Sequence, residues 1–310
     1  MAEKQISVIV CVYNREDTLP QCLEALAAQS LSPGLFEVVI VDNASTDRSP
    51  EIAASYAARF PHIRVCREPR QGLAAARNRG MREALAPVAA FTDDDAIPAA
   101  DWAERLLARF AELGADTVAV GGELDPVWTA PRPDWLTGEF LLHPLSVCLG
   151  WSEHARHLSG GEWLCEANSA YRIAPVLERG GFPETLGRIG SNLLSGENAV
   201  NQVLIRDGFR FFFDPDIRVG HQIPAQRMTR DWFRRRFFWQ GVTTFVVRQY
   251  LQQQGCDVEA VSVVPVPMNE SSWEQLFGGA VEDEAAFRDS LGQLYGLGYL
   301  LAGAGLLAGR

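Results

Sequence analysis

Lysine is nearly absent from this chain. Of the 28 basic residues among 310, Lys4 is the one lysine and all the others are arginines. Because Lys4 lies close to the N-terminus, we exclude chemistry that needs an internal lysine, such as a pyridoxal Schiff base or a P-loop phosphate contact. An anionic ligand must therefore be held by arginine, backbone amides or a metal ion, and arginine suits bidentate contacts to phosphate.

Closely spaced cysteines and an excess of positive charge are also lacking. No two of the six cysteines lie within four residues of each other, which excludes a zinc ribbon and a CxxC pair.

The formal net charge of −11 argues against a general nucleic-acid binder. The content of 47% hydrophobic and 22% charged residues excludes a disordered chain and a polytopic membrane protein. No basic, cleavable leader precedes Ile6, so we expect a cytoplasmic protein with free thiols.

The first 120 residues alternate between β-branched apolar runs and segments with helical spacing. Strands are expected at 6–12, 37–41, 63–66, 88–91 and 118–120, and helices at 19–29, 50–60, 72–85 and 100–113. Such alternation predicts an α/β domain with a mostly parallel sheet.

This regularity stops near Gly121. The stretch 122–162 shows no sustained period, which is typical of a lid or a binding wall. Helices are expected at 168–179, 196–207, 230–254 and 282–307, and β-like segments at 209–213 and 217–219. We therefore divide the chain into a domain at 1–225, with halves at 1–121 and 122–225, and a helical extension at 226–310.

The tail from 290 to 309 carries no charge and is long enough to span a bilayer, but it is rich in glycine. Three interpretations stay open: a helix packed on the core, docking to a membrane surface, or contact with a second copy of the chain. The spacing of Gly292 and Gly296 fits all three.

Acidic residues follow several of the expected strands, at the edge where an open parallel sheet binds its ligands. An acid-rich edge is unfavourable unless a cation or hydrogen-bond donors compensate it. Alternation places Asp93 and Asp95 on the same side after a buried strand, a position that suits Mg²⁺ or Mn²⁺ shared with a diphosphate. The alternative is a solvated acidic turn. No GxGxxG follows the first strand, so the dinucleotide-binding fingerprint is missing.

Four segments in order carry a family resemblance: ISVIVCVYNRED, FEVVIVDNASTDRS, RQGLAAARNRGM and AAFTDDDAIP. Together they resemble the family 2 glycosyltransferases, whose nucleotide-sugar-binding fold is called GT-A. The resemblance runs from Ile6 to about His221, and EANSAYR, GGFPETLGR and SGENAVNQVLIRDG resemble the acceptor side of that family.

The resemblance implies roles for individual residues. The positions that match nucleotide-binding residues are Tyr13, Glu16, Asp42, Arg70, Arg77, Asp93 and Asp94. Asp42 matches the acid that contacts the base, usually uracil, and Asp93 the acid that contacts the ribose. Asp95 matches the metal-ligating acid, and His221 a histidine that often completes the metal site. A buried core histidine is the alternative for His221.

The catalytic base is assigned to Glu197. The family segment normally reads Gly-Glu-Asp, whereas this chain has Asn198 at the last position. Because an amide cannot accept a proton near neutral pH, Asn198 is excluded, and Asp94 and Glu166 are the next candidates.

The sequence therefore predicts an inverting glycosyltransferase. It would use a metal, Mg²⁺ or Mn²⁺, to move a sugar from a nucleotide diphosphate, with UDP expected, to a hydroxyl of a glycan, a lipid-linked acceptor or a small molecule. A nucleotidyltransferase of similar fold would carry a glycine-rich opening and a lysine, which this chain lacks. A non-catalytic nucleotide-sugar-binding subunit is the second alternative. We expect no nucleic-acid partner.

Overall fold

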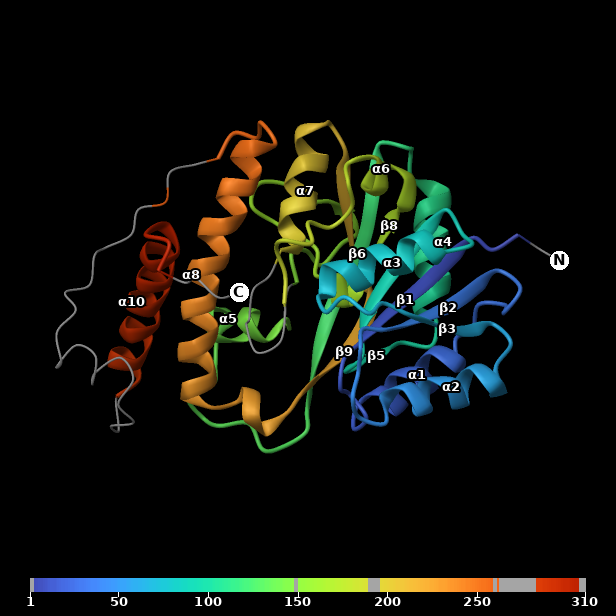
Figure 1. Cartoon of the computed structure of the whole chain (residues 1–310), viewed down its shortest axis with the longest axis horizontal. Helices are drawn as coiled ribbons and strands as arrows, with labels where there is room; N and C mark the ends of the chain where they lie inside the picture. The colour runs from blue at the N-terminus through green and yellow to red at the C-terminus, as the bar shows by residue number, and fades with distance from the viewer. Residues whose placement is uncertain (1–2, 148–149, 189–195, 259–260, 262–282, 307–310) are drawn as a thin grey trace.

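The computed structural model describes residues 3–147, 150–188, 196–258, 261 and 283–306. Within this part of the chain, one sheet of nine strands lies between two layers of helices (Figure 1). Its strands are β1 (Ile6–Val12), β2 (Phe36–Asp42), β3 (Ile63–Arg67), β4 (Val88–Asp93), β5 (Ala96–Pro98), β6 (Thr117–Trp128), β7 (Arg156–His157), β8 (Ser169–Arg172) and β9 (Arg210–Ile223).

The helices alternate with the strands in the first half and predominate at the C-terminal end. They are α1 (Leu19–Ala27), α2 (Ser49–Arg59), α3 (Leu73–Glu83), α4 (Trp102–Glu112), α5 (Glu139–Leu142), α6 (Ile173–Glu178), α7 (Glu197–Arg206), α8 (Arg230–Gln253) and α10 (Glu284–Gly303). Three 3₁₀ turns add η1 (His143–Leu145), η2 (Glu166–Asn168) and η3 (Ala225–Arg227).

The strand order is β3-β2-β1-β4-β8-β6-β9-β5, and β7 pairs with β9. The strands from β3 to β4 are parallel, as the alternating pattern predicts, whereas β8 runs antiparallel to both of its neighbours, β4 and β6. Because β1, β2 and β4 are parallel, their carboxyl ends meet at one edge of the sheet.

Both faces of this sheet are covered because its strands are apolar on both sides. In β1, Ile6 and Val8 pack with α1, α2 and α4 on one face, and Ile9 packs with α3, α6 and α7 on the other. A continuous apolar run in a strand is typical of burial on both faces. The result is a three-layer α/β/α arrangement.

The middle of the chain is more regular than its sequence indicates. The strand expected at 118–120 extends as β6 to Trp128, across the expected boundary between residues 121 and 122. The two β-like segments after residue 208 form one strand, β9, which pairs in parallel with β6 along its length. Where one helix was expected at 168–179, the chain forms η2, β8 and then α6. Pairing with distant strands fixed these elements, so local periodicity could not indicate them.

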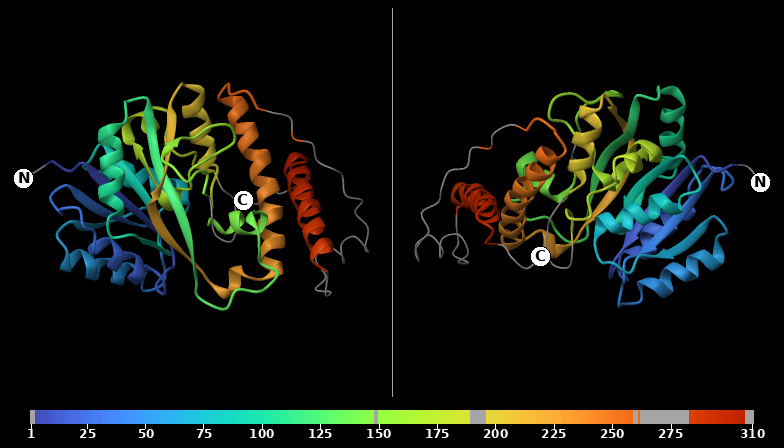
Figure 2. Two further views of the ribbon diagram at one scale, coloured as in Figure 1. Left: turned by 180° about the vertical axis from the view of Figure 1, so that it is seen from behind. Right: turned by 45° about the horizontal axis from the view of Figure 1, so that its top comes forward.

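The helices α8 and α10 lie side by side at the end of the molecule away from the N-terminus (Figures 1 and 2). Phe287 and Leu291 of α10 are fully buried, in a cluster with Phe233 of α8 and Leu141 of α5. This supports the first of the three interpretations of the tail, a helix packed on the core, for the residues up to Ala302, whereas residues 303–306 are exposed. Among the helices that the structure describes, none has both the length and the apolarity needed to cross a membrane.

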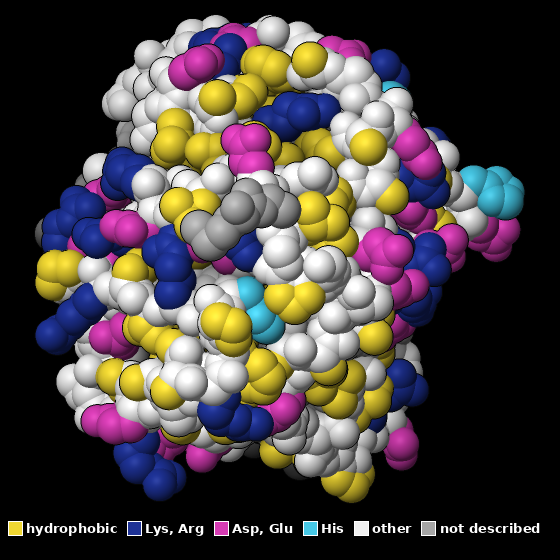
Figure 3. All heavy atoms as spheres, turned by 90° about the vertical axis from the view of Figure 1, so that its right-hand side faces the viewer, with side chains coloured by type: hydrophobic (Ala, Val, Ile, Leu, Met, Phe, Trp, Pro, Cys, Tyr) yellow, Lys and Arg dark blue, Asp and Glu magenta, His cyan; other side chains and the backbone are white. Residues whose placement is uncertain are grey.

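The surface charges are mixed. On the face that carries the N-terminal end of the chain, acidic and basic side chains are interspersed and not gathered by sign (Figure 3). Many charged side chains of the described residues form ion pairs, such as Arg105 with Asp101 at 2.6 Å.

Candidate functional site

A cavity of about 340 Å³ lies at the carboxyl ends of β1, β2 and β4. Its wall includes Tyr13 and Asn43, which follow β1 and β2, and the run from Asp93 to Asp95, which ends β4 and leads into β5. Ligands of open α/β sheets bind at this edge, where the strand order reverses around β1. The cavity is therefore the first candidate site.

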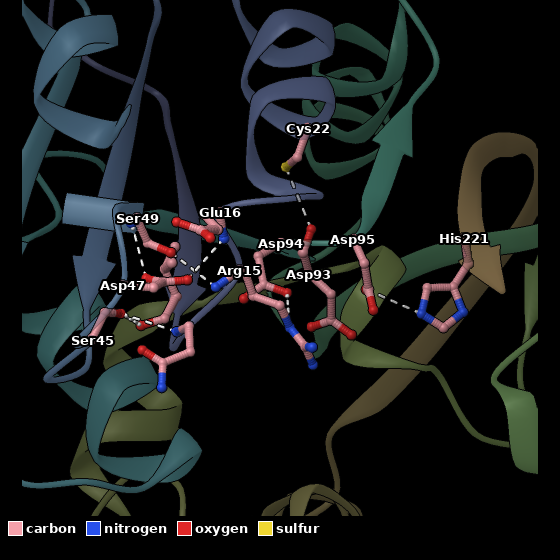
Figure 4. A network of polar contacts seen from close by, with 12 residues as sticks. Arg15, Glu16, Cys22, Ser45, Asp47, Ser49, Asp93, Asp94, Asp95 and His221 are labelled. Atoms are coloured by element: carbon pink, nitrogen blue, oxygen red, sulfur yellow. Dashed lines mark hydrogen bonds and ion pairs between the residues drawn. The ribbon is translucent and has the colours of Figure 1, made fainter. Parts of the chain in front are cut away.

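Asp95 and His221 come together through strand pairing. The chain turns directly from β4 into β5, and Ala96 of β5 lies opposite His221 of β9. The backbone N–H of Gln222 donates to the carbonyl of Asp95, with N and O 3.0 Å apart. This register brings the Asp95 carboxylate oxygen to 3.2 Å from Nε2 of His221 (Figure 4).

Asp93, Asp95 and His221 form a cluster in which the ligand atoms all lie within 4.8 Å of one another. Nδ1 of His221 lies 3.0 Å from the carbonyl oxygen of Leu145. Since a carbonyl accepts and cannot donate, Nδ1 donates its N–H to Leu145, and Nε2 faces the Asp95 carboxylate. Metal-ligating histidines are commonly oriented by such a backbone carbonyl. The two carboxylates suit Mg²⁺ or Mn²⁺. An imidazole is a common further ligand of transition metals such as Mn²⁺, so the residues present fit the expected metal.

Arginines lie beside all three consecutive carboxylates. Arg15 Nε lies 3.1 Å from Asp94, and Arg227 Nη2 lies 2.9 Å from Asp95. Arg77 Nη2 lies 3.9 Å from Asp93. The acid-rich edge that the sequence predicts is thus balanced by guanidinium groups, and Figure 4 shows Arg15 reaching Asp94.

The pKa values of the two more buried carboxyl groups, Asp94 and Asp95, shift in opposite directions. Burial raises the pKa of Asp94 to about 8, because the desolvation cost exceeds the attraction of Arg15. Burial also acts on Asp95, but Arg227 and His221 outweigh it and hold the pKa of that carboxyl well below its usual range. Asp95 is therefore the ionised partner that a cation requires.

The loops after β1 and β2 support the cavity wall through hydrogen bonds. Asn14 adopts a positive φ of 53°, and its side-chain oxygen accepts from the backbone N–H of Thr46 at 2.8 Å. Asparagine tolerates this left-handed conformation better than most residues. Asn43 is buried; its amide donates to the carbonyls of Glu68 and Arg70, and its oxygen accepts from the N–H of Gly72. These bonds fix the entry to α3.

Four of the predicted nucleotide-binding residues do not line this cavity: Glu16, Asp42, Arg70 and Arg77. The Asp42 carboxylate accepts from the N–H of Ser45 at 3.0 Å. Glu16 accepts from the backbone and side chain of Arg48, and Arg70 pairs with Glu68 and Glu184. By contrast, Tyr13, Asp93, Asp94 and Asp95 all line it. The structure thus brings the β1 and β4 residues together and places Asp42, Glu16 and Arg70 beside them.

A second cavity of about 460 Å³ adjoins the first and shares Leu73, Asp93 and Arg188 with it. Its wall comes largely from the stretch 122–225 and from α8, including Trp163, Glu166, Asn198, Arg236 and Phe237. The extension α8 is therefore part of the site. Two joined cavities can hold two ligands whose reacting groups meet at the shared residues.

Arg77 and Glu166 both line the second cavity. Arg77 is buried on α3, with its guanidinium 6.0 Å from the ring centre of Phe91 and 5.5 Å from that of Phe182. Glu166 is buried in η2, and its carboxylate accepts from the hydroxyl of Tyr171 at 3.2 Å. The structure therefore places Arg77 on the second cavity and not on the first.

Glu197 is the first residue of α7, but its side chain lies outside the described residues. The preceding residue, Gly196, lies very close to Leu186. A Cβ at position 196 would lie only 2.5 Å from the Cβ of Leu186. Asn198, the next residue, lines the second cavity. The start of α7 therefore lies at the second cavity.

Sequence reasoning did not assign Arg15, Arg227 or Asn43 to the site. Arg15 and Asn43 directly follow strands, a position that could have indicated them. Arg227 had no local signal, because its partner Asp95 lies 132 residues away in the sequence.

Comparison with known proteins connects these features to a family. Residues 7–127 match the family described as Glycosyl transferase family 2. A Haloferax volcanii protein named glucosyl-dolichyl phosphate glucuronosyltransferase is 28% identical over 83% of this chain and 81% of its own length. Another from the same organism, glycosyltransferase AglE, is 34% identical over 39% of each chain.

Solved structures share the fold at low sequence identity. S. aureus TarS in complex with UDP-GlcNAc superposes with a TM-score of 0.59 at 17% identity, over 94% of this chain and 80% of that one. The Pyrobaculum calidifontis mannosyltransferase PcManGT, in complex with GDP-Man and Mn²⁺, gives 0.58 at 20% identity, over 99% and 76%. With the matching domain, the relatives and the strand-end site in place, the chain is a glycosyltransferase of family 2 with the GT-A fold.

Proposed function

We propose that this enzyme is an inverting transferase that moves one sugar from a UDP-linked donor to an acceptor hydroxyl. The observation that carries the proposal is the pair of joined cavities, with Asp93, Asp95 and His221 at the first and the start of α7 at the second. A donor and an acceptor bound in these cavities would meet at Asp93, Leu73 and Arg188.

In this proposal the first cavity binds the nucleotide diphosphate. Asp93, Asp95 and His221 would hold Mg²⁺ or Mn²⁺, which when bound neutralises the charge that develops on the departing diphosphate. Tyr13 forms part of the wall for the nucleoside, and Arg188 lies where the two cavities join. UDP-GlcNAc in TarS and GDP-Man with Mn²⁺ in PcManGT support a nucleotide-sugar donor of this kind.

The second cavity binds the acceptor. We propose that Glu197 takes the proton of the acceptor hydroxyl as its oxygen bonds to the anomeric carbon and the diphosphate leaves. A base opposite the leaving group must come from a different segment than the metal-binding carboxylates, and the N-terminus of α7 stabilises a negative charge. A glycan or lipid-linked acceptor agrees with the name of the Haloferax relative and points to glycoconjugate synthesis.

Thermal unfolding with a panel of nucleotide sugars tests the donor. A ligand at about 100 times its Kd stabilises the folded state by about 2.7 kcal/mol. We expect UDP-sugars with Mn²⁺ to raise the Tm, EDTA to reverse the effect, and Asp95→Asn to remove the contribution of the metal.

Asp116→Asn is the matched control, because Asp116 is exposed and lines neither cavity. Equal UDP affinity in Mn²⁺, in EDTA and in Asp95→Asn would contradict the metal-assisted site. Transfer or slow hydrolysis of the UDP-sugar by the wild-type protein separates the enzyme from a sugar-binding subunit.

A further inference from the structure

Each of the three carboxyl groups at the β4 edge has a guanidinium group beside it before any ligand binds. Asp93, Asp94 and Asp95 are three carboxylates in a row, and the guanidinium groups beside them come from three separate parts of the chain: Arg77 of α3, Arg15 after β1 and Arg227 of η3. Guanidinium keeps its charge at every accessible pH. A divalent cation added alone would therefore bring uncompensated positive charge to this edge.

Arg227 occupies a different position from the other two arginines, because it contacts two members of the metal cluster, Asp95 and His221. Its Nη2 lies 2.9 Å from Oδ2 of Asp95, and its Nη1 lies 3.5 Å from Nε2 of His221. Nε2 is the nitrogen that would bind a metal. A cation held by Asp95 and His221 would consequently face a second positive charge at close range, where the surroundings are buried and screening by salt is weak.

Arg227 also lines the first cavity, where the diphosphate is proposed to lie. It belongs to a three-residue 3₁₀ turn between β9 and α8, and its side chain is 18% exposed. Arg15 pairs with Asp94, which is outside the metal cluster, and Arg77 is buried against two aromatic rings. Arg227 is thus the one of these three arginines that contacts both the metal cluster and the first cavity.

We propose that Arg227 couples metal binding to nucleotide binding, an inference that rests on the proposed function. In the nucleotide-free chain its guanidinium neutralises Asp95 and weakens the binding of a divalent cation. A diphosphate in the first cavity supplies the negative charge that accepts both the metal and Arg227. Metal and nucleotide then raise each other's affinity by the same factor, as thermodynamic linkage requires.

The test is a binding cycle on the full chain. Mn²⁺ binding is measured by electron paramagnetic resonance with and without UDP, and UDP binding by calorimetry in EDTA and in saturating Mn²⁺. For wild type, we expect UDP to raise the Mn²⁺ affinity by about ten-fold or more, within the usual range of coupling between two sites.

Arg227→Gln should strengthen Mn²⁺ binding to the nucleotide-free chain and weaken UDP binding in the presence of Mn²⁺. Mn²⁺ should bind the nucleotide-free variant about five- to ten-fold more tightly than wild type, because a nearby positive charge is gone. UDP in saturating Mn²⁺ should bind about ten-fold more weakly, because a charged contact to phosphate is lost. Arg227→Lys keeps the charge and should keep the weak Mn²⁺ binding of the nucleotide-free chain.

Arg109→Gln is the matched control. Arg109 also pairs with a buried aspartate of β9, Asp214, at 2.7 Å, but it lines neither cavity. All four of its affinities should equal those of wild type. Thermal unfolding checks that each variant folds, and Arg227→Met takes the place of the glutamine variant if that one does not.

Two results would overturn the coupling role. In the first, nucleotide-free Arg227→Gln binds Mn²⁺ no more tightly than wild type does. Arg227 would then merely orient Asp95. In the second, UDP does not change the Mn²⁺ affinity of wild type. Failure of wild type to bind UDP under any condition would instead refute the proposed function, and the nucleotide-free Mn²⁺ comparison would still decide whether Arg227 weakens metal binding.

Discussion

At the scale of single residues, two carboxylates are candidates for the catalytic base, Glu197 and Glu166, and their surroundings differ. Glu197 begins α7, where the helix N-terminus favours the charged form that a base needs. Glu166 lines the second cavity, but its carboxylate already accepts a hydrogen bond from Tyr171. Because this hydrogen bond gives Glu166 a structural role, Glu197 is the stronger candidate for the base.

Glu197→Gln should lower kcat by about two orders of magnitude or more, the range for loss of a general base. The change keeps the shape of the side chain and removes its basicity, so the affinity for UDP should stay near that of wild type. Steady-state transfer assays and UDP calorimetry measure the two quantities.

Glu166→Gln serves as the comparison, because it also replaces a carboxylate by an amide on the acceptor side. We expect a smaller effect on kcat and a lower Tm, since the contact with Tyr171 is altered. Near-normal turnover in Glu197→Gln together with a large loss in Glu166→Gln would reverse the assignment.

At the scale of elements, glycines set the distance between α8 and α10. A Cβ at Gly298 would lie 2.0 Å from the carbonyl oxygen of Phe238, and one at Gly241 would lie 1.9 Å from that of Tyr295. Each helix thus presents a glycine to the backbone of the other. The spacing of Gly292 and Gly296 noted in the sequence is not what makes this contact, because a Cβ at Gly292 would meet no atom within 4 Å.

Gly298→Ala should destabilise the protein by roughly 1–3 kcal/mol, because the methyl group forces the two helices apart. Gly292→Ala is the matched control on the same helix and should be neutral or stabilising by up to about 1 kcal/mol, since alanine favours the helix. Chemical denaturation of both variants gives the values. Equal stabilities of the two variants would contradict the close packing of α8 on α10.

How much of the fold the sequence could predict depends on whether a feature is local. Apart from β5, which was not expected, the strands and helices of the first 120 residues were predicted to within a few residues, because each carries its own period and ends. Placing Asp93 and Asp95 on one side also followed from local alternation, and the metal cluster agrees with it. The extension of β6 to Trp128 and the contact of Arg227 with Asp95 depend on segments distant in sequence, which one sequence does not reveal.

At the scale of the whole molecule, the site depends on parts that the chain supplies far apart. The first cavity comes mainly from the parallel half of the sheet, whereas the second needs η1, η2, α7 and α8. Leu73, at the start of α3, lines both, and its backbone N–H donates to the carbonyl of Arg188, which also lines both. A donor sugar attached to a diphosphate in the first cavity would therefore lie next to Leu73.

Leu73→Trp should fill this junction and separate nucleotide binding from transfer. UDP lacks the sugar, so its affinity should stay within about three-fold of wild type, whereas the UDP-sugar should bind and react about ten-fold less well or worse, a loss of about 1.4 kcal/mol or more. Leu73→Ala is the control: it enlarges the junction, so the donor should still bind and transfer should continue. UDP and UDP-sugar affinities come from calorimetry and transfer rates from product formation, with thermal unfolding to confirm that both variants fold. A folded Leu73→Trp variant with normal transfer would mean that the sugar lies elsewhere, and the two cavities would then not act as one site.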